Sequence, residues 1–177
     1  MKKIMILVFS LFIISLFLLG CSKNNDIKNS LNTINNEKGS SAQDFEVQLV
    51  DGSIFRLSDY KDKKPVIIEF WATWCPFCKQ DFNTVKNIYP KYKDDVEFIA
   101  IDLDSGEDAE TIKDYIKKNG LDDIKFAAGK TKILSDYSVT STTTKYAIGR
   151  DGKILWKGSG AIDSDSWELI FKGLKDS

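Results

Sequence analysis

The sequence contains no histidine, which is the side chain used most often as a general base near neutral pH and as a metal ligand. Acid–base chemistry must therefore rely on carboxyl, thiol or amino groups. An excess of either charge is also missing: the formal net charge is −1, and lysines and acids are interspersed. No basic surface of the kind that binds nucleic acid is expected. The 177 residues, 42% of them hydrophobic, are enough to build one folded domain.

Long apolar runs are confined to the N-terminus, which has the pattern of an export signal. Two lysines precede an apolar run from Ile4 to Leu19, which is short for a membrane-spanning helix. The run ends in Leu18-Leu19-Gly20-Cys21, which resembles the lipobox of bacterial lipoproteins, where the chain is cleaved before a lipid-modified cysteine. The alternative is an uncleaved signal anchor with a free Cys21. Both readings place the rest of the chain outside the cytoplasm.

Composition divides the chain into three parts. We expect residues 1–20 to be a lipoprotein signal peptide. Residues 21–42 are rich in asparagine, serine and charged residues and too poor in large apolar residues to pack, so we expect a lipidated flexible tether. Residues 43–177 then form the folded domain.

The pattern of apolar residues in this domain alternates between strands and helices, which predicts an α/β fold with a mixed central sheet flanked by helices. The first expected elements are a β-hairpin over residues 45–57 that turns at Asp51-Gly52, a strand over 65–71 and a helix from Cys75 to Pro90. A strand over 96–101, a helix over 107–118 that ends at Gly120, and a short helix over 132–137 follow. The last elements are a second hairpin over 145–156 and a helix that starts within 163–166, with Asp165 and Glu168 as a capping box.

The cysteines Cys75 and Cys78 stand where the buried strand hands over to a helix, with Pro76 suited to the first helical turn. This spacing lets the two sulfurs form a disulfide. Unpaired backbone N–H groups at the helix N-terminus favour a thiolate, and cysteines in this motif reach pKa values of roughly 3.5 to 7.5, against about 8.5 for a free thiol. We expect Cys75 to be the nucleophile and Cys78 the resolving thiol.

Other uses of the pair fit the sequence less well. A closed zinc site takes four cysteine or histidine ligands, and one chain offers only two sulfurs if Cys21 is acylated. A purely structural disulfide over so short a loop would stabilise the fold little. A peroxidase is also disfavoured, because Thr73 is not at the spacing from the cysteine that such enzymes use.

The stretch around the cysteines resembles the active site of thioredoxins and, more closely, of TlpA-like and ResA-like thiol-disulfide oxidoreductases; it reads Phe70-Trp71-Ala72-Thr73-Trp74-Cys75-Pro76-Phe77-Cys78. The resemblance runs over most of residues 43–174. It implies a thioredoxin fold with an N-terminal β-hairpin and an inserted helix. It also implies an enzyme that acts outside the cytoplasm and commonly reduces disulfides in cytochrome c maturation or related thiol pathways.

Within this resemblance, Glu69 matches the buried acid of thioredoxins. Burial raises the pKa of a carboxyl towards the range of a general base, so we expect Glu69 to move the proton of Cys78. The alternative is that Glu69 points to solvent. Asp81 matches a glutamate of ResA-like proteins and would tune both cysteines, although an acid in the first turns of a helix also compensates the helix dipole. We expect Trp71 in the core.

Among the residues around the cysteines, Trp74, Pro76 and Phe77 are expected to tune the site or to contact a substrate chain. The family's loop opposite the cysteines carries a cis-proline, and Thr143 takes its place here. We expect the Thr142–Thr143 peptide to be trans unless tertiary contacts hold it cis. Because the family's proline shields the cysteines from metal, its absence also leaves open a metal or cluster site between two chains.

The sequence thus favours an extracytoplasmic, lipid-anchored reductase of exported proteins that needs no cofactor and is recharged by a membrane donor of thiols. The alternatives are an oxidant that introduces disulfides through the same site, and a module that binds or delivers metal. The acidic residues Asp102, Asp104, Glu107 and Asp108 lack the spacing of a calcium loop, and we expect them to cap a helix.

Overall fold

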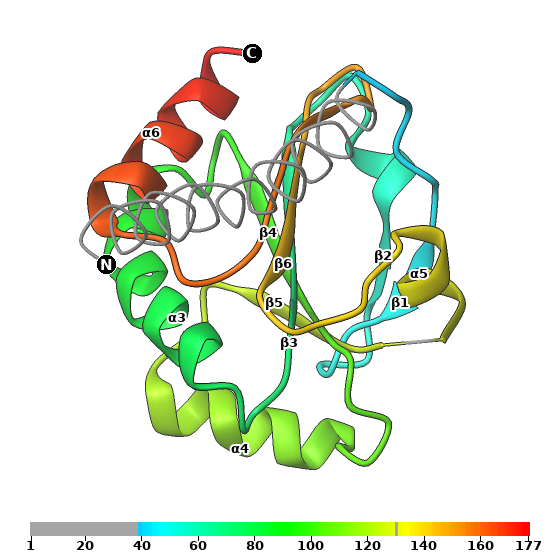
Figure 1. Ribbon diagram of the computed structural model, residues 1–177, viewed down its shortest axis with the longest axis vertical. Coiled ribbons are helices and arrows are strands. Elements are labelled where there is room, and N and C mark those ends of the chain that lie inside the picture. The colour runs from blue at the N-terminus through cyan, green and yellow to red at the C-terminus, as the bar shows by residue number, and fades with distance from the viewer. Residues whose placement is uncertain (1–38, 130) are drawn as a thin grey trace, which may run out of the picture. The chain divides into compact units, whose positions relative to one another are not determined.

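Figure 1 shows a computed structural model of the chain, which describes residues 39–129 and 131–177. The expected signal peptide, the lipidation site Cys21 and most of the expected tether lie outside the described residues. Within the described part, no helix has the length and apolar character needed to cross a bilayer.

A five-stranded sheet forms the centre of the domain, in the order β5-β4-β3-β6-β7. The strands β3, β4 and β5 are parallel, whereas β6 is antiparallel to β3 and β7 is antiparallel to β6. The mixed sheet predicted from the sequence is therefore confirmed. The strand bounds are Val66–Trp71 for β3, Glu97–Asp102 for β4, Lys125–Ala128 for β5, Thr144–Ile148 for β6 and Ile154–Gly158 for β7.

Different elements cover the two faces of this sheet (Figure 1). One face packs against three helices, α3 (Pro76–Ile88), α4 (Ala109–Asn119) and α6 (Ser164–Lys175). The other face packs against an antiparallel pair, β1 (Glu46–Gln48) and β2 (Ile54–Arg56), and the short helix α5 (Thr131–Asp136). Two short 3-10 helices, Leu57–Tyr60 and Tyr89–Lys91, complete the fold.

Every residue of the central strand β3 is buried. Side chains alternate between the faces of a strand, and those of Ile67 and Trp71 belong to the core on the helical face. Ile68 and Phe70 belong to the core on the opposite face. This alternation turns Glu69 towards the helical layer, where the cysteines lie.

The helix predicted over residues 107–118 is α4, which starts two residues later than expected and ends, as predicted, before Gly120. The carboxylate of Asp108 caps its N-terminus by accepting a hydrogen bond from Thr111 N at 2.8 Å. Gly120 follows the helix with φ of 63°, a left-handed conformation that favours glycine.

Two features differ from the expectation. The strand β5 (Lys125–Ala128) was not predicted; it is short, begins with a lysine and gains its place by pairing with β4. The capping box at Asp165 and Glu168 is wrong. The N-cap of α6 is Asp163, whose carboxylate accepts a hydrogen bond from Ser166 N at 2.9 Å, because the helix already begins at Ser164, ahead of that box.

Candidate active site

The two cysteines form a disulfide at the start of α3, with their Cα atoms 5.4 Å apart. Cys75 is the N-cap of the helix, and its sulfur accepts a hydrogen bond from Cys78 N at 3.1 Å. Both side chains are almost fully buried, Cys75 with 2% and Cys78 with 0% exposed. A sulfur at this position faces the unpaired backbone N–H groups and the positive end of the helix dipole. Both stabilise a thiolate once the disulfide is reduced.

The loop before the cysteines is held by the acidic segment that follows β4. Glu107 accepts hydrogen bonds from the backbone N and the hydroxyl of Thr73, and Asp104 accepts one from Trp74 Nε1 at 2.7 Å. Burial raises the pKa of Asp102 to about 7. A hydrogen bond from Asp104 N opposes this shift, and the nearby Glu107 adds to it. Glu107 and Asp104 thus position the active-site loop, and of the four acids expected to cap a helix, Asp108 alone does so.

Glu69 lies on β3 behind the cysteines, and its side chain is 0% exposed, so the solvent-facing alternative is excluded. Neither carboxyl oxygen has a hydrogen-bond partner among residues 39–129 and 131–177. Burial raises the pKa of Glu69 to about 8, with the charge of Lys145 lowering it and that of Asp81 raising it. A carboxyl of this kind holds its proton at neutral pH and can exchange it near the working pH of a thiol.

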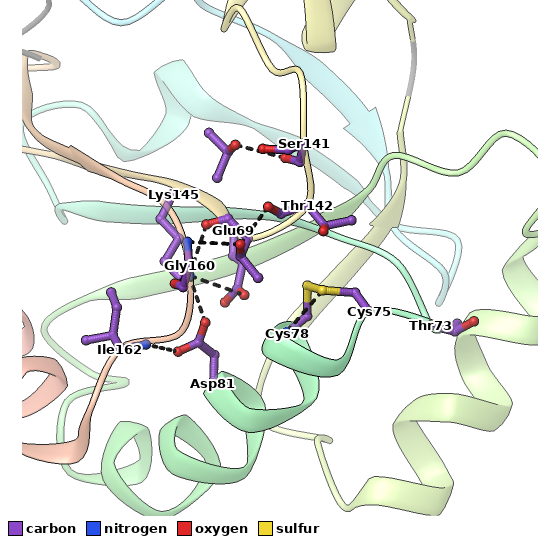
Figure 2. Close-up of a disulfide and its surroundings, with 12 residues drawn as sticks. Glu69, Thr73, Cys75, Cys78, Asp81, Ser141, Thr142, Lys145, Gly160 and Ile162 are labelled. Atoms are coloured by element: carbon purple, nitrogen blue, oxygen red, sulfur yellow. Dashed lines mark hydrogen bonds and ion pairs between the residues drawn. A yellow bond between two sulfur atoms is a disulfide. The ribbon is translucent and has the colours of Figure 1, made fainter. Parts of the chain in front are cut away.

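Asp81 is also fully buried, on the side of α3 that packs against the sheet. One carboxyl oxygen accepts hydrogen bonds from Ile162 N at 2.8 Å and from Trp167 Nε1 at 3.0 Å. The other lies 2.7 Å from Nζ of Lys145. Asp81 thus joins α3 to β6 and to the start of α6, on the same side of the site as Glu69 (Figure 2).

Lys145 is the functional candidate that the sequence reading missed. Its side chain is 0% exposed, and its Nζ lies 3.8 Å from Oε1 of Glu69 as well as close to Asp81. A lysine within a short strand that continues with Tyr146, Ala147 and Ile148 was the available signal. The pairing of β3 with β6 then places Lys145 directly opposite Glu69. Recognising it required knowledge of that pairing, which joins strands far apart in the sequence.

The loop opposite the cysteines contains the two predicted threonines. The described peptide bonds are all trans, including Thr142–Thr143. Thr143 has φ of 60° and is buried, and its hydroxyl accepts a hydrogen bond from Gly160 N at 3.0 Å. Thr142 is half-buried and lies above the disulfide in Figure 2.

The remaining predicted residues lie at the surface around the cysteines. Trp74 is 61% and Phe77 58% exposed, and Pro76 is exposed in the first turn of α3. Trp71 is in the core, as expected. Among the described residues, no group of three or more cysteines or acids is arranged to hold a metal ion.

Comparison with known proteins identifies the family to which this chain belongs. Residues 38–157 match the AhpC/TSA family. A thiol-disulfide oxidoreductase ResA of Bacillus cereus is 37% identical over 134 residues, which cover 73% of this chain and 74% of that protein. ResA of Bacillus thuringiensis subsp. konkukian is 33% identical over 140 residues, covering 77% and 78%.

Solved structures agree. A putative protein disulfide isomerase from Bacteroides thetaiotaomicron is 26% identical with a TM-score of 0.70, covering 79% of this chain and 91% of that one. The exposed lipoprotein thioredoxin Etrx1 of Streptococcus pneumoniae is 30% identical with a TM-score of 0.64, covering 75% and 100%. The expected thioredoxin fold is therefore confirmed. With its cysteine pair at the start of α3, this chain belongs to the AhpC/TSA family and, within it, to the ResA-type thiol-disulfide oxidoreductases.

Proposed function

We propose that this protein is held at the extracytoplasmic face of the bacterial cell membrane by a lipid on Cys21. There it reduces disulfides of exported proteins, in cytochrome c maturation or a related thiol pathway. A membrane donor of thiols returns it to the reduced state. The single observation that carries the direction of electron flow is the buried carboxyl of Glu69 behind the cysteine pair.

In the working direction, the thiolate of Cys75 attacks one sulfur of the partner's disulfide. A bond forms between Cys75 and that sulfur, and the partner's other sulfur leaves with the electron pair. Cys78 then gives its proton to the Glu69 carboxylate and attacks the sulfur of Cys75. The Cys75–Cys78 disulfide forms, and the partner leaves with two reduced sulfurs.

Recharging reverses these steps. A donor thiolate attacks Cys75, the disulfide breaks, and Cys78 leaves with the electron pair and takes the proton held by Glu69. A second donor thiolate then releases Cys75 as the donor becomes oxidised. Glu69 is ready to protonate the leaving sulfur of Cys78, because its pKa of about 8 keeps its carboxyl protonated at neutral pH.

The electrostatics favour a reductant. A thioredoxin-fold oxidant owes its high reduction potential to a reduced form whose thiolate is strongly stabilised. Here the buried cluster beside the cysteines pairs one cation, Lys145, with the two carboxyl groups of Glu69 and Asp81, so it supplies no net positive charge that would stabilise a thiolate on Cys78. A less stable reduced form gives electrons away more readily.

Substrate contact belongs to the exposed rim of the site. Trp74 and Phe77 present large apolar surfaces beside the cysteines, and such residues dominate protein contacts. Thr142 lies above the disulfide in Figure 2, on the loop that precedes β6. An extended segment of an exported protein can lie between them.

The reduction potential tests the proposed direction. Equilibration with dithiothreitol redox buffers should give a potential clearly below the value of about −180 mV typical of protein disulfide isomerase. A potential near the value of about −120 mV typical of strong oxidants would instead favour the alternative, a protein that introduces disulfides. Cys78→Ser should trap mixed disulfides between Cys75 and exported partners, with Cys75→Ser as the control that traps none.

A further inference from the structure

The β6 strand carries a positive charge into the interior of the domain. Lysine is almost never fully buried unless it is paired, yet the side chain of Lys145 is 0% exposed. Its Cα partner across the sheet is Glu69 on β3. Asp81 approaches from α3, so one cation faces two buried carboxyl groups (Figure 2).

The ammonium of Lys145 divides its contacts unequally. It donates hydrogen bonds to Gly160 O at 2.7 Å and to Thr143 O at 3.0 Å. A carboxyl oxygen of Asp81 lies at 2.7 Å. The ammonium thus makes two hydrogen bonds to carbonyl groups and a close ion pair with Asp81, whose oxygen on this side accepts no hydrogen bond from a described residue.

Glu69 is left with the weaker position. Its nearer oxygen is 3.8 Å from the ammonium and accepts no hydrogen bond from a described residue. If both carboxyl groups were ionised, the buried cluster would carry a net negative charge, which is costly in the interior. One proton therefore stays in the cluster, and it stays on the carboxyl with the poorer contacts.

The same ammonium holds the loop that faces the cysteines. Thr143 adopts a left-handed backbone, a conformation that costs free energy for a residue other than glycine. Its carbonyl is bound by Lys145 and its hydroxyl by Gly160 N. Gly160 O is bound by Lys145 in turn, which closes a set of contacts under the loop.

We propose that Lys145 is a positioning residue of the redox site, whose buried ammonium binds Asp81 and two loop carbonyls and thereby leaves Glu69 as the carboxyl that carries the proton of Cys78. This rests on the proton-carrying role of Glu69 proposed above. It assigns the two acids different tasks: Asp81 keeps the lysine in place, and Glu69 titrates.

The groups that face Glu69 define what a pH measurement would report. Cys78 and Asp81 approach from α3 and Lys145 from β6 (Figure 2). Tyr115 approaches from α4, and its pKa is raised mainly by burial and further by the charge of Glu69. In the oxidised protein Cys78 does not titrate, so the acids, the lysine and this tyrosine are the groups to be considered.

The test follows the Glu69 carboxyl directly. Oxidised protein labelled with ¹³C at glutamate carboxyl groups is titrated by NMR, and the Glu69 signal is identified by its loss in Glu69→Gln. Lys145→Met removes the cation and should raise the midpoint by about one pH unit or more. Asp81→Asn frees the lysine to pair with Glu69 and should lower it by a similar amount.

The double variant Lys145→Met/Asp81→Asn should fall between the two single variants and above the wild type, because Lys145 affects Glu69 more strongly than Asp81 does. Lys125→Met is the matched control: this partly buried lysine pairs with Glu97 on a neighbouring strand, and its loss should leave the Glu69 midpoint unchanged. A lysine that only stabilises the fold would lower the melting temperature without this ordered set of midpoints.

Three results separate the possible failures. An unmoved or higher midpoint in Asp81→Asn overturns the role of Lys145, even if Lys145→Met does not fold. Equal midpoints in Lys145→Met and the wild type do the same. If Glu69→Gln exchanges disulfides at the wild-type rate from pH 6 to pH 9, the proton-carrying role of Glu69 fails, whatever the midpoints are.

Discussion

The buried carboxyl of Glu69 makes the free energy of unfolding of the domain depend on pH. Its pKa is about 8 in the folded protein against an ordinary value of 4.5, so folding favours the protonated form. The stability that this form provides is complete below pH 4.5. It is lost as the pH rises towards 8, because over that interval the unfolded chain has released the proton and the folded chain has not.

We therefore expect Glu69→Gln to flatten the decline in the free energy of unfolding of the oxidised protein between pH 5 and pH 8. Each pH unit in this interval costs the wild type about 1.4 kcal/mol for one retained proton. Urea denaturation at several pH values measures this. Asp102 contributes a decline of the same sign, since its pKa is also raised, so the difference between variant and wild type is the relevant quantity.

The surface variant Glu46→Gln on β1 is the matched control and should keep the slope of the wild type, because Glu46 is an exposed partner of Arg56. A Glu69→Gln protein with the same slope as the wild type would mean that Glu69 is ionised in the folded state.

At this scale the sequence predicted the cysteine pair and the buried acid but not their environment. Cys75 and Cys78 could be predicted to form a disulfide because a short motif at the end of an apolar strand carries them, and the burial of Glu69 because it lies within that strand. Lys145 could not, since its significance depends on the register between β3 and β6. The burial of Asp81 was equally hidden, because it depends on contacts from Ile162 and Trp167.

At the scale of secondary structure, local signals placed most elements, and they failed where two local solutions compete. Both Asp163 with Ser166 and Asp165 with Glu168 have the spacing of a helix cap. In the structure Asp163 caps the helix by accepting hydrogen bonds from Ser166, and these bonds hold the pKa of Asp163 below its usual value. The strand β5 had no strong local signal in the sequence, because this segment becomes a strand through its pairing with β4.

The assignment of the cap can be tested by substitution. Asp163→Ala should lower the melting temperature by roughly 2 to 4 °C, because the first turn of α6 loses its side-chain acceptor. Asp165→Ala is the matched control and should have less than half that effect, since it removes an acid near the helix start but no cap. Calorimetry of the oxidised proteins measures both. A larger effect at Asp165 would restore the cap that the sequence suggested.

For the whole molecule, the proposed function depends on how the domain is held at the membrane. The sequence predicts a polar tether over residues 21–42, but the structure hydrogen-bonds its last residues, Gly39 to Ala42, to Gly152 and Ile154 of the domain. We propose that the polar residues between Cys21 and this contact connect the domain to its lipid, so that the exposed rim of the site can meet both a membrane donor and soluble partners. Support for this arrangement comes from Etrx1, a lipoprotein that is 30% identical to this chain.

The last prediction concerns the anchor. Wild-type protein should incorporate labelled palmitate and lose residues 1–20, whereas Cys21→Ser should do neither, because cleavage accompanies modification of the cysteine. The domain of this variant should still exchange disulfides with a small substrate at the wild-type rate. Cys78→Ser is the opposite control and should keep the lipid but lose that exchange. A wild-type protein that incorporates no palmitate and keeps residues 1–20 would favour an uncleaved signal anchor over lipidation, because such an anchor needs neither acylation nor cleavage at residue 21.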